Sequence, residues 1–212
     1  MLIHPWDRGA DQEWRAWLAT RDFGLLAANG VDSSAPVLVP TQFLYEGGDE
    51  VLLHLARPNP VWAAIEANPQ LTLAVTDDYA FVPGTWRPPA DTPPEEGVPT
   101  TYYASVHLVG TATVVDDPEL KAALIGRQLA AFQPDTPRTP VIPGQPPYGR
   151  MLSAIRGLRL QITEVRPKFK YDDKRDTELQ TSVAERLAER GRPRDPGARV
   201  QLLRRRDARG DA

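Results

Sequence analysis

The stretch HLARPNPVW, residues 54–62, places a histidine, an arginine and an asparagine around two prolines. An apolar run precedes it, and Asn59 followed by Pro60 is a strong signal for the start of a helix. Asparagine caps the first turn, and proline at the first helical position gives up no donor that the helix needs. A strand that leads directly into a helix presents backbone N–H groups and the positive end of the helix dipole at one point. We therefore predict an anion pocket at this turn, best suited to a phosphate.

Arg57 lies just before the predicted helix and adds a planar fork of donors that matches the oxygens of a phosphate. The structural alternative is that Asn59 only caps the helix, Arg57 is a solvated surface charge and His54 is an ordinary strand residue. Because helix N-termini are common and most of them bind no phosphate, the residues alone leave both interpretations open.

Polar side chains also recur along YYASVHLVGTATVV, residues 102–115, which reads as a long strand. With the strand period of two, Tyr103, Ser105, His107 and Val109 share one face, while the alternate residues are apolar and predict a packed core face. The first face offers hydroxyl and imidazole groups that can hydrogen-bond a flat polar heterocycle. A solvated strand face would show the same pattern.

Sequence patterns of other common sites are missing. There is no glycine-rich dinucleotide-binding pattern after a strand, no P-loop and no G-x-S-x-G elbow. The three histidines are too dispersed for a local metal motif, so no metal site is predicted. The chain has no cysteine, which excludes disulfides and thiolate chemistry and fits a cytoplasmic protein. Asp77 and Asp78, like Asp116 and Asp117, stand at predicted strand ends and are expected to be turn residues rather than acid/base pairs.

The elements that must position these residues are mostly strands. We expect strands at 23–30, 36–45, 51–56, 71–76, 102–115 and 157–165, and helices at 11–20, 60–67 and 117–132. The last helix is expected to bury Leu120, Leu124, Ile125 and Leu129. Most links are too short for parallel crossovers, which favours a mainly β (α+β) antiparallel barrel or sandwich with peripheral helices.

Composition is ordinary for a globular domain of 212 residues, with 41% hydrophobic and 25% charged residues and a net charge of −3. No run is apolar enough to span a membrane, and no export signal is recognisable. The proline-rich stretches 85–101 and 133–149 are expected to be loops, either functional or simply stiff linkers. From Arg192 onward the sequence contains seven arginines and three aspartates. We therefore predict a basic C-terminal tail, residues 192–212, that is partly helical or disordered.

Several stretches resemble the PaiB family, proteins named as FMN-binding negative transcriptional regulators. In chain order they are MLIHPWDRG, HLARPNPVW, VPTTYYASVHLVGTATVVDD, MLSAIRGLRLQITEVRPKFK and the helix VAERLAERG, over residues 1–191. The resemblance implies a flavin-binding split β-barrel domain of residues 1–191, related to the pyridoxamine-phosphate-oxidase-like proteins. It also implies a homodimer with FMN at the subunit interface.

The resemblance further implies roles for particular residues. The FMN phosphate maps onto His54, Ala56, Arg57 and Asn59, the isoalloxazine ring onto Val39, Pro40 and Thr41, and contacts from the neighbouring subunit onto Ser105 and His107. The chain departs from the family pattern at PGTWR (83–87), at Thr101 and Tyr102, and at YDDKR (171–175). These departures leave the predicted phosphate residues unchanged and alter the side on which a substrate would bind.

Two functions follow from this resemblance. The chain is expected to be an FMN-binding regulator or a flavin or metabolite sensor; the alternative is an FMN-dependent oxidoreductase that uses NAD(P)H on a small molecule. Binding of another planar cofactor such as haem is a third hypothesis. No catalytic residue can be assigned, although His107 and Tyr102 are candidate proton donors. Because no helix-turn-helix pattern is present, direct nucleic-acid binding is not supported.

Overall fold

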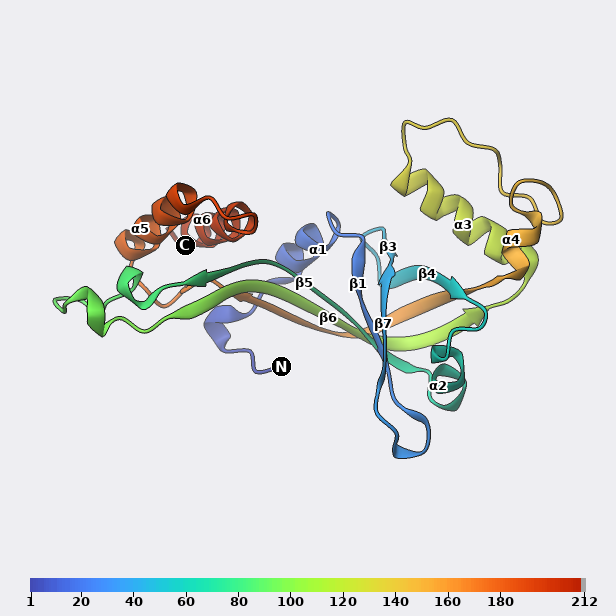
Figure 1. Cartoon of the computed structure of the whole chain (residues 1–212), viewed down its shortest axis with the longest axis horizontal. Helices are drawn as coiled ribbons and strands as arrows, with labels where there is room; N and C mark the ends of the chain where they lie inside the picture. The colour runs from blue at the N-terminus through green and yellow to red at the C-terminus, as the bar shows by residue number, and fades with distance from the viewer. Residues whose placement is uncertain (211–212) are drawn as a thin grey trace. The chain divides into compact units, whose positions relative to one another are not determined.

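The computed structural model describes residues 1–210 and contains a seven-stranded sheet with helices around it (Figure 1). The strands are β1 (Phe23–Ala28), β2 (Val37–Gln42), β3 (Leu44–Tyr45), β4 (Glu50–Ala56), β5 (Gln70–Val82), β6 (Thr100–Val115) and β7 (Ile155–Lys170). Their order in the sheet is β2-β1-β5-β6-β7-β4-β3, so that within the described residues the sheet has two edges and is not closed. The pairs β1–β2, β1–β5, β3–β4 and β4–β7 are antiparallel. The predicted antiparallel, mainly β architecture is confirmed.

Six α-helices and four short 3₁₀ turns complete the described chain. The helices are α1 (Asp11–Leu18), α2 (Val61–Ala67), α3 (Pro118–Phe132), α4 (Gly149–Ser153), α5 (Thr177–Arg190) and α6 (Asp195–Gly210). The 3₁₀ turns are η1 (Pro5–Asp7), η2 (Val31–Ser33), η3 (Gly84–Trp86) and η4 (Pro94–Glu96). None of the helices within residues 1–210 has both the length and the apolar character needed to cross a bilayer.

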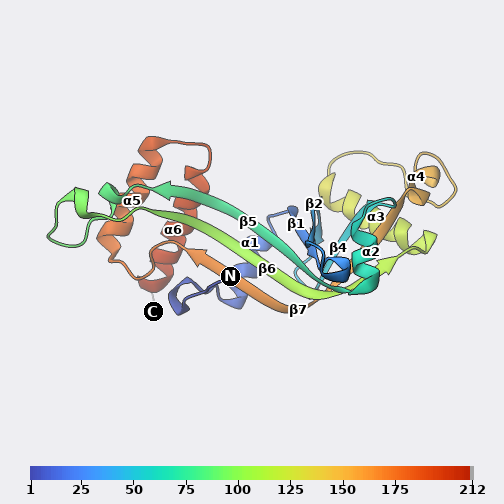
Figure 2. The same ribbon diagram turned by 60° about the horizontal axis from the view of Figure 1, so that its bottom comes forward.

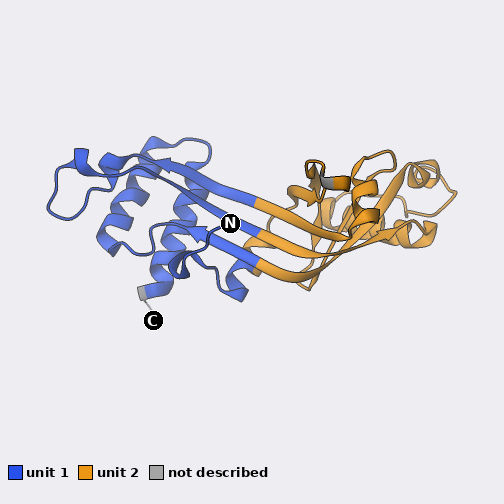
Figure 3. Cartoon of the chain, turned by 90° about the horizontal axis from the view of Figure 1, so that it is seen from below, with its two compact units in different colours: residues 1–14, 76–106, 166–212 blue, residues 15–75, 107–165 orange. Residues whose placement is uncertain are grey.

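The chain divides into two compact units (Figure 3). The first consists of residues 1–14, 76–106 and 166–212, and the second of residues 15–75 and 107–165. Strands β5, β6 and β7 are neighbours in the sheet (Figure 2), and each of them contains residues of both units. The division into a domain of residues 1–191 and a C-terminal tail remains a prediction.

In the second unit, α3 packs against β3 and β4 through an apolar cluster of Leu44, Leu52, Ala122, Leu124, Ile125 and Leu152. Asp117 caps this helix as its residue type predicts, since its Oδ1 accepts from the Leu120 amide at 2.9 Å. The predicted buried face is confirmed at Leu124 and Ile125, which lie in the cluster, and at Leu129, which packs against it. Leu120 was predicted wrongly, since it is 60% exposed, and the polar residues Lys121 and Gln128 are buried beside the apolar ones.

In the first unit, the arginine-rich residues from Asp195 onward form α6, which packs on α5. The side chain of Asp195 joins the two helices, because it accepts two bonds from the Arg190 guanidinium, at 2.6 and 2.8 Å. Arg205 donates to Glu13 at 2.7 Å and to Asp173 at 2.6 Å. Of the arginines in the predicted basic tail, Arg194, Arg204, Arg205 and Arg206 are partners in ion pairs within the unit.

The sequence predicts a strand end at Asp77 and Asp78, but both residues lie inside β5. Asp78 still has the left-handed backbone (φ 53°) that aspartate tolerates in turns. The strand continues because partners distant in sequence hold this residue: its carbonyl accepts from the Tyr171 hydroxyl at 2.8 Å, and its Oδ2 accepts from Gln201 at 2.9 Å. Such partners are invisible in the local sequence.

Candidate functional site

The turn between β4 and α2 carries the predicted phosphate residues and lies entirely in the second unit. The cap position of α2 is occupied by Pro60 rather than by Asn59 as predicted, but the Asn59 side chain still serves the helix start, since its Oδ1 accepts from the Val61 amide at 3.0 Å. The helix begins at Val61 rather than at Pro60 and is only seven residues long. The indole of Trp62 donates to the Ala56 carbonyl at 2.9 Å, which fixes the start of the helix against the end of β4.

The backbone amides of this turn are not available to an anion. Arg57 N–H donates to the Ala154 carbonyl at 2.8 Å, Asn59 N–H to the Ala56 carbonyl at 3.0 Å, and Trp62 N–H to the Asn59 carbonyl at 3.3 Å. Pro58 and Pro60 have no N–H to offer. The sequence argument relied on free amides, so that part of its physical reasoning is wrong. An anion at this turn would have to be held by side chains.

Arg57 is the side chain best placed for that role. Its side chain is about half exposed, at 47%. Its Nε donates to the Ser153 carbonyl at 2.9 Å and its Nη2 to Asp116 Oδ1 at 3.0 Å. Within the described residues Nη1 donates to no acceptor, and it remains available for a ligand. The anchoring bonds reduce the side-chain freedom that an anion would otherwise have to restrict on binding.

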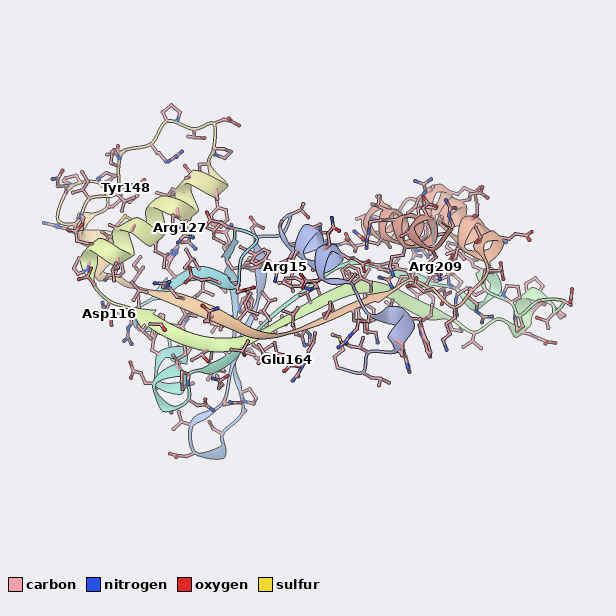
Figure 4. The ribbon with its side chains drawn as sticks, turned by 180° about the vertical axis from the view of Figure 1, so that it is seen from behind. Arg15, Asp116, Arg127, Tyr148, Glu164 and Arg209 are labelled. Carbon is pink, nitrogen blue, oxygen red and sulfur yellow. The ribbon has the colours of Figure 1, made fainter. Side chains whose placement is uncertain are left out.

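Asp116 lies at the end of β6 (Figure 4) and joins two arginines. Its second carboxylate oxygen accepts from Arg156 Nε at 3.0 Å, and Arg156 also donates to Glu66 at 2.7 Å. Burial would raise the pKa of Asp116, but the hydrogen bonds and charges of Arg156 and Arg57 outweigh it and hold this pKa below its usual range. The carboxylate is therefore charged at neutral pH and offsets part of the positive charge of the two arginines.

A buried lysine adds positive charge to this corner. Lys121 Nζ donates to the Leu152 carbonyl at 2.7 Å and to the Ile155 carbonyl at 3.2 Å, and it has no carboxylate partner within the described residues. Together with Arg57 it borders a cavity of about 400 Å³, whose lining is Arg57, Asp116, Pro118, Lys121, Pro143, Gly144, Gly149, Leu152 and Ser153. An unpaired buried ammonium and a free guanidinium edge beside one cavity fit a phosphate dianion.

Sequence reasoning missed Lys121, although a signal was present. A lysine three residues before Leu124 and four before Ile125 falls on the predicted apolar face of the helix. A lysine on an apolar helical face either extends its long side chain to solvent or places a buried charge that has a structural or functional role.

His54 points away from the core of the unit and is exposed. Its Nδ1 lies 2.7 Å from Gln128 Oε1, and Gln128 Nε2 donates to the Leu52 carbonyl at 3.3 Å. Because the amide nitrogen of Gln128 faces that carbonyl, its oxygen faces the ring, so we assign the proton to Nδ1. The opposite nitrogen, Nε2, is then open to a ligand.

The predicted ring-contacting residues lie on β2, paired with β1. Val39 is half-buried and Pro40 is exposed, whereas Thr41 is buried and its hydroxyl donates to the Gln42 carbonyl at 3.0 Å. Val39 pairs with Leu26 and Pro40 with Leu25. These backbone positions are therefore fixed by the β1–β2 ladder.

Ser105 and His107 follow each other on one face of β6 but belong to different compact units. Ser105 is buried, and its hydroxyl lies 2.8 Å from that of Thr76; His107 is half-buried. The prediction of a core face on this strand is confirmed, since Ala104, Val106, Leu108 and Ala112 are all buried.

The positions at which the chain departs from the family pattern come together in the first unit. Arg87 donates from Nη2 to Asp172 Oδ1 at 2.7 Å, and the Tyr102 hydroxyl donates to Asp172 Oδ2 at 2.9 Å. Burial, followed by the charge of Asp172, raises the pKa of Tyr102 well above its ordinary value. This phenol is fully buried and bonded to a carboxylate, so it is not placed to donate a proton to a substrate.

Comparison with known proteins gives a family and a fold. Residues 2–164 match the family described as "Putative FMN-binding domain". No curated protein matches the chain in a sequence comparison.

Three solved structures illustrate the fold. A conserved hypothetical protein from Mycobacterium tuberculosis is 16% identical, covers 80% of this chain and 90% of its own, and has a TM-score of 0.56. A flavocytochrome from Azotobacter vinelandii is 19% identical (83% and 75% covered, TM-score 0.58). An FAD- and haem-binding protein from Mycobacterium smegmatis is 20% identical (83% and 78% covered, TM-score 0.55). At these identities the likeness concerns the fold alone.

Proposed function

We propose, from the premise that the chain belongs to the "Putative FMN-binding domain" family, that it is a PaiB-type cytoplasmic flavoprotein in which bound FMN acts as a sensor or regulatory element. FMN is the cofactor of this family. The observation that carries the assignment of the phosphate end is the surplus of positive charge beside Arg57, where Arg57, Arg156 and Lys121 face two carboxylates.

In this proposal side chains rather than amides hold the phosphate. Arg57 donates from Nη1, Asn59 offers its side-chain amide N–H₂, and the ammonium of Lys121 adds attraction from within the unit. His54 Nε2 adjoins the same turn. Val39, Pro40 and Thr41 are proposed to contact the isoalloxazine ring, and Ser105 and His107 to reach it from the partner subunit. When bound, the flavin supplies redox chemistry, and the protein supplies binding and orientation.

We further propose that the protein is a homodimer with FMN at the subunit interface. The β1–β2 hairpin supports this, because its outer face exposes apolar side chains that have no cover within the second unit. Phe23 is 58% and Leu38 56% exposed, and Leu25 stands opposite Pro40 in the strand pairing. An exposed apolar face on paired strands is typical of a protein interface.

A regulatory role need not involve direct DNA contact. The arginines from residue 192 to 210 include several that pair with Glu13, Asp77, Asp173 or Asp207, and this leaves less free positive charge than the sequence suggested. Nucleic-acid binding relies on basic groups that are free to meet phosphates. We therefore place regulation at the flavin or at a metabolite, with other proteins transmitting it.

The test is to titrate FMN into the purified protein and then add NADH or NADPH under anaerobic conditions. Bound flavin that neither nicotinamide reduces supports the sensor. Flavin that bleaches and recovers in air supports the alternative, an FMN-dependent oxidoreductase. Two solved structures with this fold are named for flavin or flavin-and-haem binding, which keeps electron transfer worth testing. Failure to bind FMN at all would end both proposals.

A further inference from the structure

The first unit contains a cavity of its own, with a volume of about 540 Å³. It lies among the N-terminal turn η1, the loop around η3, the start of β6, the end of β7 and the turn that follows β7. The lining residues are His4, Trp6, Asp7, Arg87, Thr100, Lys170, Asp172, Asp173, Lys174 and Arg175. All of them belong to the first unit, so the cavity shares no residue with the Arg57 corner. Its volume is in the range of small-molecule sites.

The acidic groups on the wall of this cavity are already engaged by cations. Asp172 accepts from Arg87 at 2.7 Å, Asp173 accepts from Arg205 at 2.6 Å, and Asp7 lies 3.8 Å from Lys168 Nζ. Their negative charges are therefore largely offset, and they add little repulsion toward an incoming anion.

Three cations on the wall have no carboxylate partner within the described residues. Lys170 Nζ donates only to the Thr100 hydroxyl, at 2.7 Å. Lys174 Nζ lies 3.7 Å from the centre of the Trp6 ring, and Arg175 is exposed. Lys174 and Arg175 are adjacent in the turn, and Lys170 ends β7 just before it. The cavity is thus bordered by unpaired positive charge from one short segment.

The end of β7 concentrates this charge further. Lys168 and Lys170 flank the buried Phe169, so the strand period places both on one face, at 5.5 and 5.9 Å from the centre of the Tyr103 ring. Burial, followed by the charge of Lys168, lowers the pKa of Lys170. Lys168 is already offset by Asp7, so the positive charge left for an anion at the end of β7 is that of Lys170, which a bound anion would compensate.

We propose that this cavity binds a small molecule through a carboxylate or phosphate group, with Lys170 as the principal ligand and Lys174 and Arg175 closing over the anion. Both groups present several acceptor oxygens, and the ammonium and guanidinium donors of Lys170, Lys174 and Arg175 have no such charged acceptor within the described residues. The site is separate from the flavin corner and does not depend on the proposed function.

The test is calorimetric titration of the full chain, both without FMN and with FMN in excess, and anion binding in this cavity should be the same in the two titrations. The probes are phenyl phosphate and benzoate, and benzyl alcohol is the uncharged control. We expect one or both anions to bind at millimolar concentration or below, and benzyl alcohol not to bind. Binding of phenyl phosphate alone would assign phosphate esters to the site, and binding of benzoate alone would assign carboxylates.

Lys170→Met and Lys174→Met should each weaken anion binding by about tenfold, the loss expected for one charge-assisted bond. Lys174 is exposed, so its variant tests the site even if Lys170→Met impairs folding. Arg138→Met removes one exposed positive charge from the second unit and should leave affinity unchanged. Lack of binding by both anions, or equal affinity in the lysine variants and the parent, would overturn the proposal.

Discussion

Replacing Arg57 by alanine should weaken FMN binding by about 1.5 to 3 kcal/mol, the usual contribution of a hydrogen bond to a charged group. That loss corresponds to a rise in Kd of about ten- to 150-fold. The prediction rests on Arg57 Nη1, which has no acceptor within the described residues although the rest of the guanidinium is anchored.

The structure also indicates that this loss would not come from unfolding. Arg57 and Asp116 are 47% and 43% exposed, and an ion pair at such exposure contributes at most about 1 kcal/mol to stability. Asp116 keeps its second partner, Arg156, so no carboxylate is left unpaired when Arg57 is removed. The effect on the folded state should therefore be small compared with the effect on the bound phosphate.

The assay is a fluorescence titration with FMN and, in parallel, with riboflavin, which has the same ring system but no phosphate. Arg57→Ala should weaken FMN binding and leave riboflavin affinity nearly unchanged. Arg127→Ala provides a matched control, because Arg127 on α3 (Figure 4) is 49% exposed and pairs with Glu46. Equal losses for FMN and riboflavin, or an unchanged FMN affinity, would refute the assignment of Arg57 to the phosphate.

Three other predictions concern assembly and stability. Leu38→Glu should convert the dimer to a monomer in light-scattering measurements. Val98→Glu is the control and should leave the dimer intact, because Val98 is 69% exposed in the first unit. A parent protein that is already monomeric would contradict the proposed interface. Tyr102→Phe should lower the free energy of unfolding by about 1.5 to 3 kcal/mol in urea, because the carboxylate of Asp172 loses a buried donor; a change near zero would argue against that bond. Asp195 accepts a hydrogen bond from Arg190, and this bond lowers the pKa of Asp195 in the folded state. The stabilisation that this pair gives the folded state is present above the unfolded pKa and is lost as the pH falls below about 4. Asp195→Asn should therefore flatten the acid limb of the stability profile, and an unchanged slope would show that this carboxylate does not contribute.

The fold could be predicted from the sequence to the extent that its signals are local. Alternation of apolar residues placed the strands, Asp117 marked a helix start through a cap that the structure contains, and Asn59 marked another through its bond to the Val61 amide. The same local rules failed at Asp78, where a turn-like backbone occurs within a strand because Tyr171 and Gln201 hold it. A left-handed aspartate is a reliable local signal, but whether it ends a strand depends on residues that pack against it from elsewhere.

The candidate site could likewise be predicted only as far as its signals are local. Residue types identified Arg57 as an anion-binding side chain, and its half-exposed position suits that role. The availability of the amides could not be predicted, because the acceptor for Arg57 N–H is the carbonyl of Ala154, almost a hundred residues later. Lys121 was missed although it lies on the predicted apolar face of α3, because the local sequence does not show whether a lysine there is buried or extends to solvent.

The two positively charged sites differ in how the sequence encodes them, and that difference bears on how each could be found. At the Arg57 corner, His54, Arg57 and Asn59 lie close together around one turn and can be recognised in the sequence, whereas Lys121 comes from α3 and cannot. Around Lys170 the three free cations are also close in sequence, but they look like an ordinary solvated run until Asp7, Asp172 and Asp173 are seen to be neutralised by Lys168, Arg87 and Arg205. Counting charges along the chain would therefore predict a nearly neutral patch there. Only the pairing in three dimensions shows which charges remain to bind a ligand.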